Sequence, residues 1–254
     1  MGNAGSAGNA MPAAVYEGRG VTRVVDRPVP NPTADQVLIE IGHCGICGSD
    51  LHLLVEGWGA PGTIAGHEYS GVIRALGSGV RGWAVGEAVV GGPPRACGRC
   101  RRCAAGQPSQ CEDRAGTTGE QDGGGFARYV AVDAGRLVRL PEGLSPRTAA
   151  LAEPLAVALH AVTRAELSPG DTVMVFGAGP IGALAVAALV ADGRYPVTVV
   201  EPNEGRRQLA LGIGAVAAVD PEVLERYEPW EPERRSPHAV DAVLECSGKR
   251  AAIE

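Results

Sequence analysis

The stretch VMVFGAGPIG, residues 173–182, decides the fold of the C-terminal half of the chain. Its first four residues form the short apolar run that is typical of a buried strand, and residues 181–191 have the composition of a helix. Residues 177–182 fit G-x-G-x-x-G, which by itself is a weak pattern. Between a strand and a helix it predicts a dinucleotide site; the alternative is a tight turn without a ligand.

The next predicted strand, residues 197–200, supports the dinucleotide interpretation. It ends at Glu201, which lies 19 residues after Gly182. A carboxylate there accepts hydrogen bonds from the adenosine ribose and repels a 2′-phosphate, which favours NAD over NADP. Arg206 and Arg207 would weaken this preference, unless they form a solvated helix face. The pyrophosphate would lie at the N-terminus of the helix. The predicted cofactor residues are Gly177, Gly179, Pro180, Ile181, Gly182, Glu201 and Arg206.

The two halves of the chain differ in periodicity. Short runs separated by Gly and Pro predict a mainly β domain, and after Ser145 the alternation of helices and strands predicts a parallel sheet. The expected strands of the first half are 21–25, 37–41, 72–76, 87–90, 127–132 and 137–140. The second half is expected to contain a helix over 147–162 interrupted by Pro154, a helix over 206–211, and strands 216–219 and 241–246.

Length and composition limit the classes of function. The 254 residues are 45% hydrophobic and 20% charged, with a net charge of −6, as in a soluble protein with two domains. No apolar run is long enough to cross a bilayer, and the first residues have no signal-peptide pattern. The acidic balance predicts no nucleic-acid or membrane partner, and the cysteines suit the cytoplasm. We expect a disordered leader over 1–11 and domains over 12–160 and 161–254.

A C-x2-C-x2-C-x7-C run predicts a structural zinc site within a lobe over residues 95–113. Its ligands would be Cys97, Cys100, Cys103 and Cys111. Two disulfides are the rival interpretation, but they are typical of small secreted scaffolds. Four thiolates complete the zinc shell, so this metal would bind no substrate. Neighbouring arginines would offset the charge of the site; they are Arg95, Arg99, Arg101 and Arg102.

A second set of metal-ligand types is spread along the chain. Cys47 occurs in a CGSDLH segment, His67 and Glu68 occur in GHE, and Glu153 precedes a proline. Three protein ligands and one exchangeable position are the arrangement of a catalytic zinc. Each residue alone is weak evidence, since a lone cysteine is usually buried filler.

Together these motifs resemble the zinc-dependent medium-chain dehydrogenases, the superfamily of alcohol, sorbitol and threonine dehydrogenases. The motifs that carry the resemblance are residues 47–52, 66–68, the four cysteines, 153–155 and 177–182. The resemblance implies an α/β protein with a GroES-like catalytic domain, followed by a Rossmann doubly wound parallel sheet. The polyol and threonine branch is most similar, because it shares the CGICGSD segment and the Glu-Pro pair.

The resemblance also implies roles for single residues. Cys47 and His67 bind a catalytic zinc, and either Glu68 or Glu153 is its third protein ligand. The zinc acts as a Lewis acid on the substrate hydroxyl and a hydride passes to NAD. The proton leaves through Ser49, the nicotinamide ribose hydroxyl and His52. Without the resemblance, Ser49 reads as a turn hydroxyl and His52 as a surface imidazole. Cys44 and Cys246 match no ligand position and are expected to pack in the interior.

The expected substrate is a small secondary alcohol: a polyol, diol, cyclitol or 3-hydroxy amino acid. Members of the family continue beyond the position of Glu254, so we expect a chain that is truncated relative to them and a homo-oligomer in the full-length form. The second hypothesis is an inactive zinc-binding or dinucleotide-binding scaffold. A zinc-free reductase is disfavoured because both ligand sets are present.

Overall fold

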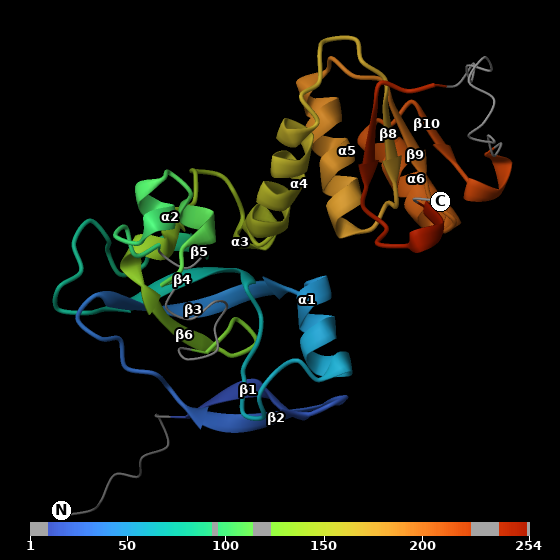
Figure 1. The fold of residues 1–254 in the computed structure, drawn as a ribbon. Coiled ribbons are helices and arrows are strands. Elements are labelled where there is room, and N and C mark those ends of the chain that lie inside the picture. The colour runs from blue at the N-terminus through green and yellow to red at the C-terminus, as the bar shows by residue number, and fades with distance from the viewer. Residues whose placement is uncertain (1–9, 93–95, 114–122, 225–238, 253–254) are drawn as a thin grey trace, which may run out of the picture. The chain divides into compact units, whose positions relative to one another are not determined.

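The computed structural model describes residues 10–92, 96–113, 123–224 and 239–252 (Figure 1). Residues 1–9 of the predicted leader, Arg95, and residues 225–237, in a segment to which the sequence assigns no function, lie outside this range. The chain consists of two compact units, Met1–Glu153 and Pro154–Glu254. The sequence placed this boundary seven residues later, at 160/161.

The first unit contains a five-stranded antiparallel sheet in the order β6-β3-β4-β5-β7. Its core is formed by β-branched side chains such as Val37, Ile39 and Ile73, which are fully buried. This confirms the mainly β character of the N-terminal half. The strands are β3 (Gln36–Gly45), β4 (Glu68–Leu76), β5 (Ala88–Gly91), β6 (Tyr129–Asp133) and β7 (Leu137–Arg139).

A separate hairpin of β1 (Ala10–Gly18) and β2 (Val21–Pro28) has its own small core. The first strand begins at Ala10, and the side chain of Met11 is only 4% exposed. The predicted leader over 1–11 is therefore too long by two residues, because alternate side chains of this strand are buried in the unit.

Short helical segments connect the strands of the first unit. The segment that follows β3 is a single turn of α-helix, α1 (Gly48–Leu51), continued by a π-helical turn, η1 (His52–Glu56). Gly57 ends it in the left-handed conformation, with φ of 81°. The others are α2 (Arg101–Ala104), η2 (Pro108–Gln110), η3 (Ala134–Arg136) and α3 (Pro146–Ala149).

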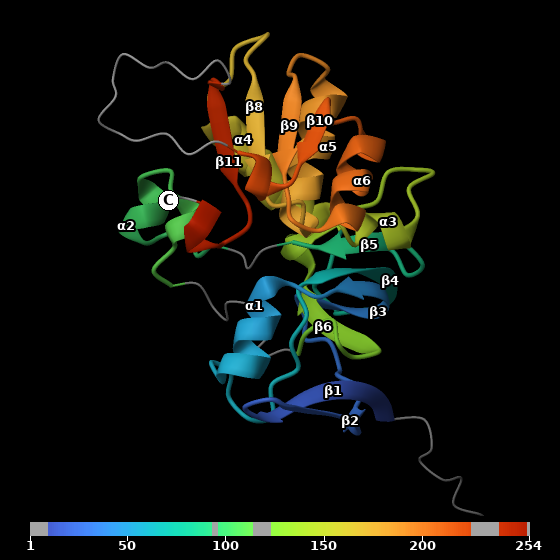
Figure 2. The same cartoon turned by 90° about the vertical axis from the view of Figure 1, so that its right-hand side faces the viewer.

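The second unit contains a parallel sheet in the order β10-β9-β8-β11, whose strands lie side by side in Figure 2. Its core joins fully buried valines of β8 and β9 to helix residues such as Leu189. The parallel sheet predicted for the second half is thus confirmed. The elements are α4 (Ala152–Arg164), β8 (Val173–Phe176), α5 (Pro180–Asp192), β9 (Val197–Val200), α6 (Glu204–Ile213), β10 (Ala217–Val219), η4 (Pro221–Val223), β11 (Ala242–Glu245) and η5 (Arg250–Ala252).

Pro154 does not interrupt a helix, which corrects one expectation. The helical conformation is interrupted by a turn at Ala150 and Leu151, and α4 then begins at Ala152. Pro154 falls in the first turn of α4, where a backbone N–H has no partner within the helix and its loss costs little. Within the described part of the chain, none of the helices has the length and apolarity needed to cross a membrane.

Candidate functional site

The first ligand set converges at one end of the β3–β4 pair. Cys47 is the N-cap residue of α1, and His67 and Glu68 lie where β4 begins. The antiparallel register pairs Gly45 with Glu68, which brings the two segments together. One ligand atom from each of Cys47, His67 and Glu68 lies within 4.8 Å of the others. A thiolate, an imidazole and a carboxylate at this spacing are suitable zinc ligands.

Asp50 connects the two loops that carry these ligands, although its side chain is only 3% exposed. Its Oδ2 accepts a hydrogen bond from the backbone N–H of Cys47 at 2.9 Å, and its Oδ1 accepts one from Gly66 at 3.3 Å. Its Oδ1 also lies 3.8 Å from Nδ1 of His67. Sequence reasoning assigned Asp50 no role; an acidic residue three positions after a helix N-cap was the available signal.

The carboxylate of Glu68 occupies space that a glycine leaves open. A Cβ added at Gly45 would lie 2.1 Å from Oε2 of Glu68. Burial, and then the negative charge of Glu153, raises the pKa of Glu68. Glu153 is therefore close enough to act on Glu68 electrostatically, but it is not part of the ligand group that the described residues form.

A pocket of about 300 Å³ opens beside this ligand set within the first unit. Ser49 and His67 contribute polar atoms to its wall, while Leu53, Trp58 and Ala65 contribute apolar surface. His52 is not among the lining residues, but its ring stacks on that of Trp58. The pocket is large enough for a small molecule next to the ligand atoms.

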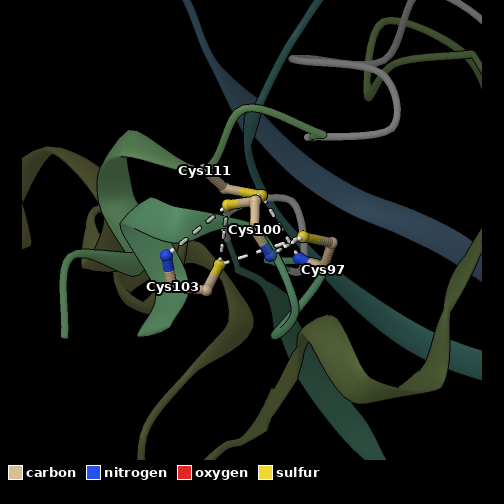
Figure 3. Close-up of side chains that lie close together, drawn as sticks. All are labelled: Cys97, Cys100, Cys103 and Cys111. Atoms are coloured by element: carbon tan, nitrogen blue, oxygen red, sulfur yellow. Dashed lines mark hydrogen bonds between the residues drawn. The ribbon is translucent and has the colours of Figure 1, made fainter. Parts of the chain in front are cut away.

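The four cysteines of the lobe point their sulfur atoms toward a common centre (Figure 3). The sulfur atoms lie within 4.8 Å of one another and form no disulfide bond. Backbone N–H groups, first of all that of Glu112, lower the pKa of the Cys100 thiol to about 6, which favours a thiolate. The donor set and its spacing fit a closed zinc site.

The arginines of the lobe have partners other than the sulfur atoms. Arg99 pairs with Asp113, and Arg101 pairs with Glu112. Arg102 donates to the side chain of Gln107. The guanidinium groups are thus satisfied mainly by the lobe's own carboxylate and amide oxygens. Of the remaining cysteines, Cys44 packs against the core of the first unit and Cys246 against that of the second, as expected.

The three glycines within residues 177–182 differ in why a glycine is needed at each position. Gly177 has φ of 88°, and a Cβ at Gly182 would lie 1.9 Å from the carbonyl oxygen of Gly177, so both are required by the fold. Gly179 differs, because a Cβ there would meet no atom within 4 Å. It is the N-cap residue of α5, which continues with Pro180 and Ile181. An open space at a helix N-terminus fits the pyrophosphate of a dinucleotide.

Glu201 follows β9 and is only 3% exposed. Its Oε2 accepts a hydrogen bond from the backbone N–H of Ala178 at 2.7 Å, and its Oε1 accepts one from Asn203 at 2.9 Å. Each oxygen keeps a second lone pair for another donor. The side chain of Arg206 is 56% exposed and lies 3.9 Å from Oε2.

Arg207 is not part of a solvated helix face, so the alternative that the sequence allowed for this residue is wrong. Its guanidinium donates to the carbonyl oxygens of Glu201 and Pro202 and to Asp220. The guanidinium of Arg207 is therefore bound mainly to the turn that follows β9. Arg206 is therefore the more accessible of the two arginines.

Known proteins resemble this chain over most of its length. Residues 33–142 match the model of the alcohol dehydrogenase GroES-like domain. The chain is 37% identical to 2-dehydro-3-deoxy-L-galactonate 5-dehydrogenase of Pseudoalteromonas atlantica, over 95% of this chain and 71% of that protein. The chain belongs to the zinc-dependent medium-chain dehydrogenases. A sorbitol dehydrogenase of Halalkalibacterium halodurans is also 37% identical to this dehydrogenase, over 91% of the chain and 68% of the relative.

The solved structures lead to the same family. A zinc-binding dehydrogenase from Sinorhizobium meliloti, crystallised with NADP, superposes with a TM-score of 0.86 at 35% identity, over 96% of this chain and 72% of that one. The chain is thus an oxidoreductase of the alcohol dehydrogenase type, from a family that contains zinc and uses NAD or NADP. The relatives give no support to the hypothesis of an inactive scaffold.

Proposed function

We propose that this dehydrogenase oxidises a small secondary alcohol to a ketone with NAD and holds two zinc ions. One zinc would be bound by Cys47, His67 and a carboxylate, and the other by the four cysteines of the lobe. The candidate substrates are polyols, vicinal diols, cyclitols and 3-hydroxy amino acids. Because the chain resembles both a sugar-acid dehydrogenase and a sorbitol dehydrogenase, a polyhydroxylated substrate has the strongest support.

The observation that supports this proposal best is the convergence of Cys47, His67 and Glu68 beside a pocket lined by Ser49. Glu68 is the carboxylate we assign to the catalytic zinc, because its oxygen lies within 4.8 Å of the other two ligand atoms. Glu153 would be the exchanging carboxylate, since its charge already acts on Glu68.

The residues of the first unit would handle the substrate and its proton. When bound, zinc supplies Lewis acidity that lowers the pKa of a hydroxyl group. Ser49 lines the pocket and would take up the hydroxyl proton, which His52 would pass to solvent. NAD, when bound by the glycine loop of the second unit, would supply the acceptor for the hydride that the carbinol carbon loses. Asp50 would hold Cys47 and His67 in place.

The second unit would bind the cofactor through its glycine loop. Gly177 and Gly182 shape the turn, the open space at Gly179 would receive the pyrophosphate, and Pro180 and Ile181 begin the helix behind it. The negative charge of Glu201 supports NAD over NADP, because a 2′-phosphate would meet a carboxylate. Arg206 is exposed nearby and would contact the ribose.

Zinc content measured by elemental analysis tests the proposal. We expect two zinc ions per chain, one after Cys47→Ser, and oxidation of at least one of the candidate alcohols by the unmodified protein only. Cys103→Ser is the matched control, since it should remove the other zinc and leave the first ligand set intact. A zinc content that Cys47→Ser does not change would overturn the assignment of the catalytic site.

Two further expectations accompany this function. The thiol groups of both ligand sets require a reducing compartment, on which ground we place the protein in the cytoplasm. We also propose that the protein forms a homo-oligomer.

A further inference from the structure

His52 is held by two contacts that no role so far explains. Its Nδ1 lies 2.8 Å from Oε1 of Glu56, four residues further along the chain. Its ring is stacked on that of Trp58, with the centroids 4.9 Å apart and the planes 14° from parallel. Trp58 also lines the pocket, so His52 lies next to a pocket residue.

Hydrogen bonds from another segment hold the backbone between His52 and Glu56. His52 and Glu56 are the first and last residues of the π-helical turn η1. The turn of the β1–β2 hairpin meets it: the backbone N–H of Gly20 donates to the carbonyl oxygen of Leu54 at 2.6 Å, and Nε of Arg19 donates to that of Val55 at 3.1 Å. A widened turn held by two external donors keeps Glu56 within reach of His52.

We propose that Glu56 is a positioning residue that holds the neutral His52 imidazole in the tautomer with its proton on Nδ1. This inference rests on the proposed function, in which His52 receives the proton of the substrate. An ionised carboxylate can only accept, so Nδ1 must be the donor of the 2.8 Å contact. A neutral imidazole has one N–H, which leaves Nε2 with the free lone pair. Nε2 is then the atom that can take up a proton.

The stack on Trp58 completes the restraint. The hydrogen bond to Glu56 fixes which edge of the ring is occupied, and the parallel ring of Trp58 fixes its plane. An exposed ion pair of this kind contributes little to stability, because water and salt screen it. The side chains of His52 and Glu56 are 49% and 46% exposed, so a function in orientation explains the contact better than one in stability.

Imidazole ¹⁵N NMR on the full chain tests the inference without any need for turnover. The signals of His52 are assigned by their loss in His52→Gln. Glu56→Gln keeps an acceptor oxygen, so we expect the Nδ1–H tautomer to predominate as in the unmodified protein. Glu56→Ala removes the acceptor, and we expect the Nε2–H tautomer to become the major form. Glu17→Gln is the matched control, since Glu17 is 42% exposed and, among the residues that the structure describes, pairs with Arg23.

Two outcomes would overturn the inference: an Nε2–H tautomer in the unmodified protein, or a tautomer that Glu56→Ala leaves unchanged. A second readout uses the accepted substrate. Glu56→Ala should lower kcat/KM by roughly tenfold, part of the effect of a general base, and free imidazole in the buffer should restore it. If no alcohol is oxidised but the tautomers behave as expected, the proposed function fails and the positioning of His52 by Glu56 stands.

Discussion

The side chain of Asp50 holds the backbone of Cys47, with Oδ2 accepting the Cys47 N–H at 2.9 Å inside the first turn of α1. The other oxygen of the same carboxylate faces the loop of Gly66 and His67. One buried carboxylate thus spans the two segments that supply the ligand atoms, which lie 20 residues apart in sequence, at Cys47 and His67.

Asp50→Asn should weaken zinc binding at the Cys47 site by about 10- to 100-fold, as loss of a supporting residue around a metal ligand usually does. Asparagine keeps one acceptor oxygen, while its NH₂ group would face a backbone donor. Zinc affinity is measured by competition with a chelator. Asp192→Asn, which disturbs an exposed pair with Arg194 in the second unit, should leave the affinity unchanged. Equal affinities for the two variants would contradict the role of Asp50.

Gly45→Ala should displace the carboxylate of Glu68, because the added Cβ would lie 2.1 Å from Oε2. We expect a loss of about 1–3 kcal/mol in the free energy of unfolding, as for other overpacked sites. Denaturant titration measures it. Gly48→Ala is the control, since its Cβ would meet nothing within 4 Å and should not destabilise the protein. If both variants unfold at the same denaturant concentration as the parent, the packing argument is wrong.

Gly179→Ala and Gly182→Ala should separate cofactor binding from folding. At Gly182 the new Cβ would lie 1.9 Å from a backbone oxygen, so this variant should lose roughly 1–3 kcal/mol of stability or more. At Gly179 it would enter open space, so stability should be kept while the affinity for NAD falls. Calorimetric titration with NAD and thermal unfolding measure the two effects. Unimpaired NAD binding by Gly179→Ala would show that the pyrophosphate does not bind at Gly179.

Glu201→Gln should reduce the preference for NAD over NADP by about 10- to 100-fold, since a charge-assisted hydrogen bond is worth about 1.5–3 kcal/mol. The same change replaces one acceptor oxygen by an NH₂ group, which would face the backbone N–H of Ala178 or Asn203. The protein should therefore also be less stable. The ratio of the two dissociation constants is the measurement. Glu204→Gln, in the first turn of α6, should not alter the ratio. An unchanged ratio in Glu201→Gln would argue against its contact with the ribose.

Much of the fold could be predicted from local pattern. The apolar run of β8, the glycines after it and the helix that follows are encoded within consecutive residues, so their order was predictable. The sequence places the interruption of the helix at Pro154, but it lies before α4. The reason is that proline occurs both where a helix is interrupted and in the first turn of a helix. The start of the first domain, expected at residue 12, lies two residues earlier, at Ala10, since small residues have weak local preferences.

The site divides in the same way. Ligand types and their spacing are properties of the sequence. The four cysteines of the lobe, Cys47 and His67 are therefore predicted as ligands from the sequence, which leaves Glu68 and Glu153 as alternatives for the third catalytic ligand. The hydrogen bonds of Asp50 to Cys47 and of Glu56 to His52 depend on the conformation of the turns, so sequence reasoning assigns no role to either carboxylate.

The sequence by itself determined the family, the order of strands and helices and the residue types that can bind metal and dinucleotide. Only the tertiary structure shows that Glu68 lies with Cys47 and His67 in one group of potential metal ligands that does not include Glu153, and that Gly182 is required by packing while Gly179 faces open space. The physical reason is that ligand chemistry is a property of each side chain, whereas distance and free volume arise only when strands pair and loops pack against each other.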